Sequence, residues 1–152
     1  YISYFKEAFL FFVLEHFSYS LKEQKTLPSK IYCIDNGLRN SVSFKFSEDA
    51  GKLAENLVFL ELIKSEEIYY WKNEKHEEVD FIVKNKDNSL TAINVCYSDE
   101  INKRETKALL SFEEEFSKTK KMLIITKNVE KKEMGIKFIP LWKWLLGDKQ
   151  AN

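Results

Sequence analysis

The sequence predicts an α/β domain whose sheet is flanked by two helices, with a small α/β segment in front of it. Two helical patterns occur at residues 50–65 and 102–117. Three consecutive strand-like runs lie between them, at residues 67–71, 77–83 and 90–97. A wholly apolar run at 122–126 follows the second helix, as expected of a strand covered on both faces. The order from Ala50 onward is therefore helix, three strands, helix, strand.

The first forty residues of the sequence predict a small α/β segment. Residues 2–14 start as a helical pattern and become an apolar run that fits a helix and a strand alike. Residues 22–29 are polar and contain Pro28, and residues 30–35 then alternate like a strand until the turn signal at Asn36-Gly37. We interpret this stretch as a small α/β lead-in.

The chain is expected to divide after residue 46. Residues 1–46 are interpreted as the remnant of a preceding linker or winged-helix-like region, and residues 47–152 as the main domain. Because Tyr1 stands inside a helical pattern, we expect the chain to be a fragment of a longer protein.

The two long helices differ in how they should be buried. Residues 50–65 leave little polar face, so that helix is expected to be covered on two sides. The second helix carries one stripe, formed by Glu105, Ala108, Leu109, Phe112 and Phe116. A last strand at 135–140 and a short helix at 141–146 are expected to close the domain.

Composition limits the function. With 24 Lys and Arg against 24 Asp and Glu, the chain has no bulk positive charge that would hold nucleic acid everywhere. Arg39 and Arg104 are the only arginines, so sequence-specific reading of bases is not expected. Cys33 and Cys96 lie in apolar runs without metal or disulfide spacing and are interpreted as buried thiols of a cytoplasmic protein. The sequence contains no run of 18 apolar residues that would predict a membrane span, so no membrane partner is expected.

Polar groups interrupt two consecutive apolar strands. Asp80 shares a face with Ile82, and Asn94 shares a face with Cys96, because residues two apart in a strand point the same way. If the strands pair as a hairpin, Asp80, Asn94 and Cys96 cluster on one face of the sheet. Metal-dependent phosphodiesterases hold their metal with carboxylates, because Mg²⁺ prefers charged oxygen ligands.

Several stretches resemble a known family. They are Lys30–Tyr32, Ile34–Leu38, Gly51–Leu62, Tyr70-Trp71, Glu78–Phe81, Ile93–Ser98 and Ile139–Leu146. On these stretches, residues 1–146 resemble the C-terminal domain of unknown function of archaeal-type prokaryotic AAA+ ATPases, within the restriction-endonuclease-like PD-(D/E)XK superfamily. The resemblance implies a restriction-endonuclease-like core in residues 47–152. It also implies an ATPase domain as partner, with ATP bound only in that missing part.

The resemblance implies a catalytic and metal-binding set with two substitutions. Glu55 and Asp80 stand where the family has its metal-binding acids. Asn94 stands where a further acid would be, and Cys96 stands at the position of the motif lysine. An active site would use Mg²⁺ or Mn²⁺ on Glu55, Asp80 and Asn94. Lys84, Lys103, Arg104 or Lys107 could supply the missing positive charge, although Lys84 lies far along its strand.

Each of these residues also has a structural interpretation. Glu55 could pair with a lysine, Asp80 could bind turn amides, and Asn94 could form a hydrogen bond with Asp80. Cys96 is interpreted as a small core residue.

For function we expect a degenerate nuclease domain, not itself catalytic, that serves the ATPase as a nucleic-acid-binding or regulatory module. The alternatives are an active divalent-metal-dependent DNA nuclease and a protein-interaction or oligomerisation module. An interaction module would use exposed aromatic residues such as Tyr1, Tyr4, Phe5 and Trp144. DNA and a second copy of the chain are the candidate partners besides the ATPase domain.

Overall fold

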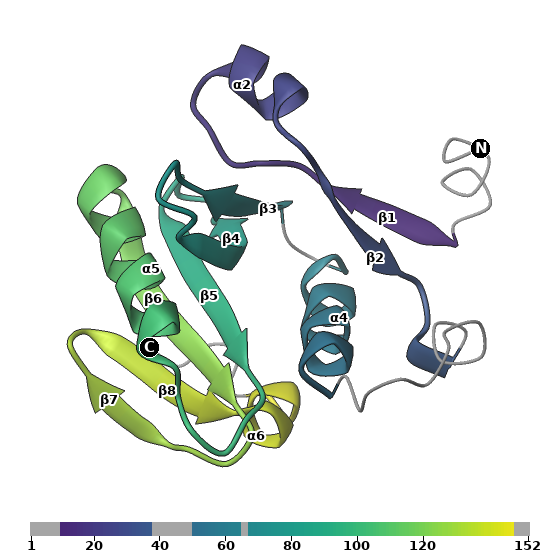
Figure 1. Cartoon of the computed structure of the whole chain (residues 1–152), viewed down its shortest axis with the longest axis vertical. Coiled ribbons are helices and arrows are strands. Elements are labelled where there is room, and N and C mark those ends of the chain that lie inside the picture. The colour runs from purple at the N-terminus through teal and green to yellow at the C-terminus, as the bar shows by residue number, and fades with distance from the viewer. Residues whose placement is uncertain (1–9, 38–49, 65–66, 148–152) are drawn as a thin grey trace.

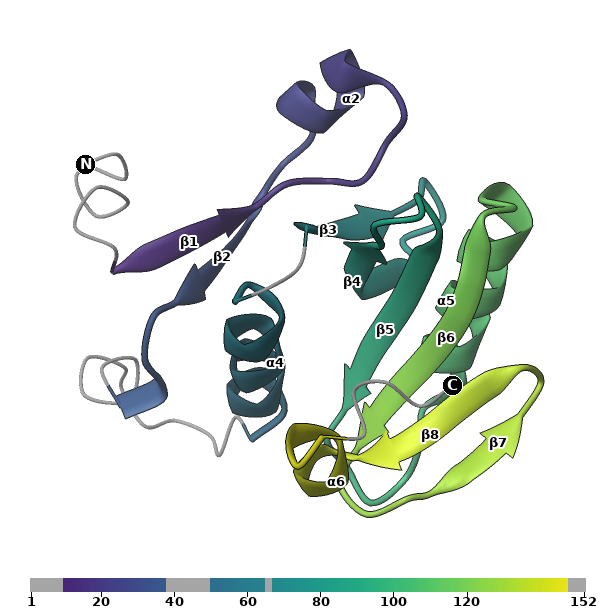
Figure 2. The same cartoon turned by 180° about the vertical axis from the view of Figure 1, so that it is seen from behind.

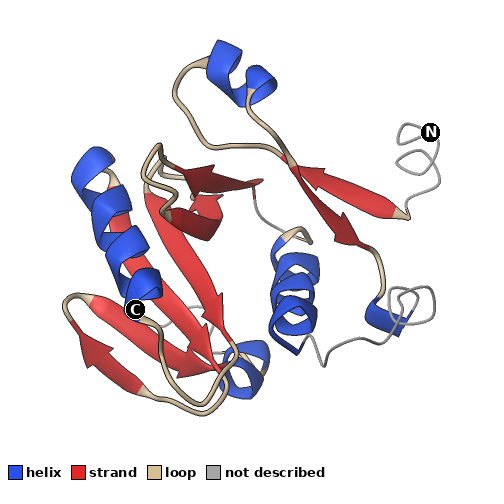
Figure 3. Ribbon diagram, in the orientation of Figure 1, coloured by secondary structure: helices blue, strands red, loops and turns tan. Residues whose placement is uncertain are grey.

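The computed structural model describes residues 10–37, 50–64 and 67–147, which form a mixed α/β fold (Figures 1 and 3). The described elements in chain order are β1 (Phe11–Leu14), α2 (Leu21–Thr26), β2 (Lys30–Cys33), α4 (Ala50–Leu62), β3 (Glu67–Lys72), β4 (Glu78–Lys84), β5 (Leu90–Cys96), α5 (Lys103–Glu115), β6 (Thr119–Thr126), β7 (Lys131–Glu133), β8 (Ile136–Pro140) and α6 (Leu141–Leu145).

The main sheet has six strands in the order β3-β4-β5-β6-β8-β7. Strand β6 is parallel to both of its neighbours, β5 and β8, whereas the pairs β3–β4, β4–β5 and β7–β8 are antiparallel. The parallel pair β5–β6 needs a crossover connection, and α5 provides it. The sheet is therefore mixed, and its central strands β5 and β6 are covered by helices.

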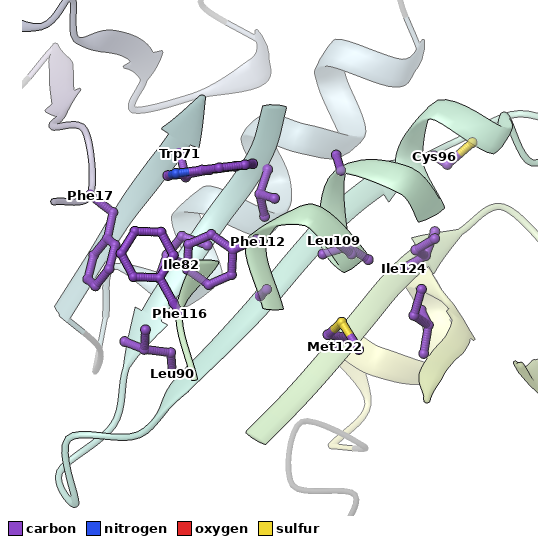
Figure 4. Packing of buried hydrophobic residues seen from close by; sticks show 14 of the residues in the cluster. Phe17, Trp71, Ile82, Leu90, Cys96, Leu109, Phe112, Phe116, Met122 and Ile124 are labelled. Carbon is purple, nitrogen blue, oxygen red and sulfur yellow. The ribbon is translucent and has the colours of Figure 1, made fainter. Parts of the chain in front are cut away.

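Helices α4 and α5 lie on opposite sides of this sheet (Figures 1 and 2). Alternation along the strands sorts the core into two clusters: Ile82 and Ile124 face α5, while Phe81 and Ile125 face α4. Figure 4 shows the α5 side, where Trp71, Phe112 and Phe116 pack together. The expected stripe of α5 is confirmed, since its residues Ala108, Leu109 and Phe112 are buried.

A second, two-stranded sheet forms from β1 and β2 and lies against α4 (Figure 2). The Tyr32 ring of β2 stacks on the Phe59 ring of α4 with centroids 4.2 Å apart. Asn56 of α4 accepts a hydrogen bond from the Cys33 backbone N–H and donates one to the Cys33 carbonyl, both at 3.0 Å. Helix α4 is thus covered on two sides, as the sequence predicted.

The order helix, three strands, helix, strand from Ala50 is confirmed. The ambiguous apolar run at 2–14 contains strand β1, and its residues before Leu10 lie outside the described part of the chain. Two short elements were not expected. Helix α2 has Ser20 as its N-cap, whose side chain accepts from the Glu23 backbone N–H, and β7 joins β8 through a turn with positive φ at Met134 and Gly135.

Other expectations concern residues that the structure does not describe. The predicted division at residues 46 and 47 lies outside the described ranges, as do Tyr1, Tyr4 and Phe5, so all of these stay predictions. Cys33 and Cys96 are buried free thiols, as expected. None of the described helices is long and apolar enough to span a membrane.

Candidate functional site

The candidate site begins where β4 and β5 stop pairing. Their backbone register runs as far as Phe81 opposite Ile93. At the next position the strands are joined through side chains: the Asp80 backbone N–H donates to Asn94 Oδ1 at 3.0 Å, and the Val95 backbone N–H donates to Asp80 Oδ2 at 2.9 Å. The opening of the hairpin thus leaves Asp80 Oδ1 free to face out of the sheet toward other elements.

Those other elements are α4 and β2. Lys30 of β2 places its Nζ 3.1 Å from Asp80 Oδ1, 3.4 Å from Glu55 Oε1 of α4 and 2.7 Å from Glu78 Oε1 of β4. The Tyr32 hydroxyl donates to the same Glu55 oxygen at 2.6 Å. We call Glu55, Glu78 and Asp80 the carboxylate cluster. One ammonium group therefore lies among three carboxylates that come from two different elements.

The local sequence explains why β2 supplies both groups. Lys30 and Tyr32 are two residues apart in an extended strand, so both point to the same side, while Ile31 points away and is 54% exposed. Antiparallel pairing with β1 and the contacts of Asn56 with Cys33 fix the strand over α4. Lys30 thus reaches the sheet although the two-stranded sheet contributes no strand to it.

Asn94 is fully buried and has hydrogen-bond partners on both ends of its amide. Its Oδ1 accepts from Asp80, and its Nδ2 donates to Glu105 Oε2 at 2.8 Å and to the Glu105 carbonyl at 3.2 Å. Arg104 pairs with the other Glu105 oxygen at 3.3 Å. Asn94 therefore connects the end of β5 to the first turn of α5.

The electrostatics follow from several acids in a small volume. Burial raises the pKa of Asp80 to about 7, and although Lys30 lowers it, the nearby Glu55 carboxylate raises it further. Burial by itself lowers the pKa of Lys30, but Asp80 and Glu55 outweigh this, so its pKa is raised and the ammonium stays charged. Burial also raises the pKa of Glu105. The contacts of Glu105 with Arg104 and Asn94 lower this pKa but do not cancel the effect of burial. The site thus holds more acids than cations.

A polar pocket of about 380 Å³ opens beside the cluster. It is lined by Glu55, Lys72, His76, Glu78, Asp80, Val95, Arg104 and Glu105. A larger pocket of about 830 Å³, which shares Lys72, His76 and Glu78 with it, extends over Trp71 and the loop around Pro28. Lys72 bridges the two from the rim, 3.1 Å from Glu78 Oε2. The two pockets therefore meet at Lys72, His76 and Glu78, beside the cluster.

The structure brings together Glu55, Asp80 and Asn94, the three residues that the sequence analysis named for catalysis or metal. A lysine partner for Glu55 is confirmed. The expected bond between Asn94 and Asp80 exists, but it uses the Asp80 backbone N–H and not its carboxylate. The amide that Asp80 binds belongs to a neighbouring strand, Val95, and not to a turn.

Cys96 does not join the cluster. Its thiol lies 3.3 Å from the Ser98 hydroxyl and packs in the α5 side of the core, as its interpretation as a core residue predicted. Among the proposed lysine replacements, Lys84 pairs with Glu67 and Lys107 with Glu77, whereas Arg104 does line the polar pocket. The cation at the cluster is Lys30, which was not proposed for this role.

The donor set does not fit a divalent ion in this arrangement. The Asn94 carbonyl oxygen already accepts from Asp80, and the Lys30 ammonium takes the point where the carboxylate oxygens converge. The Nζ–O distances suit ammonium hydrogen bonds and exceed the ~2.0–2.1 Å that Mg²⁺ requires. Within the described residues, no group of three or more His, Cys, Asp and Glu side chains is arranged to hold a metal ion.

Fold and site together define a mixed α/β domain with a cluster of three carboxylates that share one lysine. Residues 50–144 match the model of the family described as a domain of unknown function, DUF4143. The chain belongs to this DUF4143 family.

Two curated relatives extend the match beyond that region. The chain is 40% identical to an uncharacterized protein, MJ1544, of Methanocaldococcus jannaschii, over 96% of this chain and 35% of that protein. It is 30% identical to an uncharacterized protein of Haemophilus influenzae, over 96% of this chain and 36% of that protein. The chain thus spans about a third of the length of these relatives. No solved structure matches the chain significantly.

Proposed function

We propose that this chain is a degenerate PD-(D/E)XK nuclease-like domain of a AAA+ ATPase, and that it acts as a nucleic-acid-binding or regulatory module without cutting nucleic acid itself. The observation that carries the proposal is the position of Lys30. A metal-dependent phosphodiesterase needs its carboxylates free to hold the ion, and here they share one ammonium group. Asn94, at the position of a further acid, contributes no charge.

The fold supports the structural half of this proposal. A helix, an antiparallel three-stranded unit, a crossover helix and a parallel strand is the order that a restriction-endonuclease-like core would have. The relatives are about three times as long as the aligned part, so they have room for an ATPase domain. We place the domain in the cytoplasm with that ATPase as its partner.

The charge around the site favours the regulatory role over direct contact of DNA at the cluster. Glu55, Glu78 and Glu105 line the polar pocket with Asp80, and carboxylates repel phosphate groups. Lysines elsewhere are partly neutralised, for example Lys120 by Asp87 and Lys127 by Asp99. DNA binding would therefore use a surface away from the cluster and would weaken steeply with salt.

Cleavage of labelled duplex and branched DNA in the presence of Mg²⁺ or Mn²⁺ tests the proposal. We expect no product above that of the Asp80→Asn variant, while binding of the same DNA is measured in parallel at two salt concentrations. Cleavage that disappears in Asp80→Asn would overturn the non-catalytic assignment.

An active nuclease is a second candidate, because one observation favours it. Lys30 brings a lysine to the acids Glu55 and Asp80, and such a lysine could stabilise developing negative charge if a metal displaced it from the carboxylates. In that case both Lys30→Met and Asp80→Asn would abolish cleavage. The same assay therefore separates the two candidates.

The interaction module loses one of its proposed residues. Trp144 is only 2% exposed and packs on the α4 side of the core, so the expectation that it is exposed is wrong. It faces inward because α6 uses Leu141 and Trp144, three positions apart, to cover the sheet. Trp142 and Leu146 are exposed in its place.

A further inference from the structure

A row of lysines lies on the face of the six-stranded sheet against which α4 and α6 pack. Lys121 of β6 is opposite Thr91 of β5, and Lys137 of β8 is opposite Leu123, two residues after Lys121. Lys132 of β7 is directly opposite Lys137. We call Lys121, Lys137 and Lys132 the lysine row; the first and last are exposed, and Lys137 is half-buried. The row crosses the neighbouring strands β6, β8 and β7, which can be followed in Figure 2.

Alternation along the strands places the row on one face. Its members on β6 and β8 share the face of Leu123, which packs on the α4 side of the core. Their sequence neighbours Met122 and Phe138 pack on the α5 side. In β7, the Nζ of Lys131 lies 4.7 Å from the centre of the Phe138 ring, so the next residue, Lys132, points to the α4 side.

The exposed members of the row differ from the lysines next to them in having no acid of their own. The lysine that precedes each of them in the sequence is paired, Lys120 with Asp87 and Lys131 with Glu133. Within residues 10–37, 50–64 and 67–147, no carboxylate forms an ion pair with either exposed member. The row is therefore a local concentration of positive charge on a chain with zero net charge.

Two members of the row also face each other. Lys132 and Lys137 are directly opposite in an antiparallel pair of strands, where like charges repel and destabilise the pairing. A ligand that brings several negative charges to this face would remove the repulsion. The row therefore suits an anionic chain and not an apolar partner.

The row is remote from the carboxylate cluster. Asp80 accepts from the Val95 backbone N–H near the end of β5, whereas Lys121 is opposite Thr91 near the beginning of that strand. The two levels differ by about 13 Å along the strand, at about 3.3 Å per residue. Helix α6 follows Pro140 and contacts β6 and β8 at their other end. Phosphate groups on the row would therefore avoid the carboxylates that repel them.

We propose that the lysine row binds the phosphate backbone of a nucleic acid across β6, β8 and β7, without reading its bases. A lysine ammonium group attracts phosphate as a point charge, and phosphate contacts carry no sequence information. This inference rests on the proposed function. It gives the nucleic-acid-binding role a surface of its own, on the part of the sheet that the carboxylate cluster does not reach.

Binding of labelled duplex DNA to the 152-residue chain, measured by fluorescence anisotropy over a series of salt concentrations, tests the inference. The variant is Lys121→Gln with Lys132→Gln. The matched control is Lys120→Gln with Lys131→Gln, which removes the same charge from adjacent positions of the same two strands.

The salt dependence separates the two variants. In the row variant, the slope of the logarithm of the association constant against that of salt should fall by about 2, since each lost phosphate contact contributes about 0.9. Affinity at about 0.1 M salt should fall roughly tenfold or more. The control should change both quantities far less, because its lysines are already paired with acids. Equal effects in the two variants would overturn the inference, since net charge alone would then explain them.

A charge-preserving variant guards against a purely structural effect. Lys121→Arg with Lys132→Arg should keep the slope of the wild type, and thermal melts should show all variants folded because the substituted side chains are exposed. Loss of binding in the arginine variant as well would count against the inference.

Failure of the inference can be told apart from failure of the proposed function. A wild type that binds DNA with a slope that the row variant leaves unchanged would overturn the inference and leave the proposed function in place, on another surface. Cleavage of DNA by the wild type would overturn the non-catalytic assignment and is a separate measurement. A wild type that binds neither duplex nor single-stranded DNA would overturn both the inference and the nucleic-acid-binding part of the proposed function.

Discussion

Lys30 Nζ and Asp80 Oδ1 lie 3.1 Å apart, and this contact joins a strand of the two-stranded sheet to a strand of the six-stranded sheet. An ion pair between partly buried groups is worth little by itself, because desolvation offsets most of the attraction. Removal of the lysine alone destabilises the fold, because the remaining acids stay partly buried and no longer have a cation beside them. The contact therefore matters most for how the site responds to change.

The Lys30→Met variant should lower the free energy of unfolding by about 1–3 kcal/mol, less than the ~3–5 kcal/mol for a deeply buried pair. The expected loss is smaller than for a deeply buried pair because the side chain of Lys30 is 21% exposed. Urea denaturation in metal-free buffer measures it.

Lys72→Met is the control for that measurement and should cost less than about 1 kcal/mol, as exposed pairs do. An equal loss in both variants would show that Lys30 contributes no more than a surface charge.

The raised pKa of Asp80 predicts an unusual dependence of stability on pH. Between its ordinary value of 3.8 and its folded value of about 7, the folded state holds the proton more tightly than the unfolded state does. This group therefore stabilises the fold fully below about pH 4, and that contribution is lost as pH rises through about 7, with a slope of at most about 1.4 kcal/mol per pH unit.

The difference between the wild type and Asp80→Asn isolates this effect. Other acids act in the opposite direction: the pKa of Glu77 is lowered to about 2, chiefly by its hydrogen bond with Lys107, so its contribution is lost in acid. Free energies of unfolding measured from pH 4 to pH 8 should show the advantage of the wild type shrinking with rising pH. A difference that grows over this range would contradict the assignment.

Restoring an acid at position 94 should destabilise the domain. In Asn94→Asp, a carboxylate oxygen would replace the Nδ2 group that now donates to Glu105 Oε2 at 2.8 Å, so two acids would face each other in a fully buried position. We expect a loss of about 1–3 kcal/mol at neutral pH, and a smaller loss in mild acid, where the two groups can share a proton.

Glu105→Gln combined with Asn94→Asp should recover much of that loss, because the glutamine amide can donate to the new carboxylate. Absence of recovery in a thermal melt would place the cost elsewhere, for example in the hydrogen bond from the Asp80 backbone.

The main sheet could be predicted from the sequence because its signals are local. The stripe of α5 and the apolar run of β6 each depend on spacing within a single element. The alternation expected within β4 was wrong at Asp80. A register shift between β3 and β4 turns the Asp80 carboxylate toward Lys30 and α4, whereas Ile82 and Cys96 pack on the α5 side.

Lys30 could not be found in this way. Its partners are 25, 48 and 50 positions away, and their approach depends on how the lead-in docks on α4, which no periodic pattern encodes. One signal was available: Lys30 and Tyr32 alternate with Ile31, so a charged residue had to share a face with a tyrosine that would be buried. Helix α2 was missed for a different reason, since the N-cap residue Ser20 was not recognised.

Docking of the lead-in should depend on Asn56. Its side chain forms two hydrogen bonds of 3.0 Å with the backbone of Cys33, much as a neighbouring strand would, and it is 4% exposed. In Asn56→Ala the Cys33 N–H and carbonyl would lose these partners in a buried place, at a cost of about 1–3 kcal/mol. Hydrogen exchange should then accelerate in β1 and β2 more than in β5 and β6.

This pattern follows because β1 and β2 form a sheet of their own, which meets the rest of the fold through α4, the cluster and the bridge between His16 and Tyr70 of β3. Asn56→Asp is the matched variant: it keeps the oxygen that accepts from the Cys33 N–H and loses the donor to the carbonyl, so its effect should be intermediate. If exchange accelerates equally in both sheets, Asn56 stabilises the whole domain as one unit, and the β1–β2 unit cannot undock by itself. Selective acceleration in β1 and β2 would instead show that the strand carrying Lys30 can leave the cluster while the main sheet stays folded.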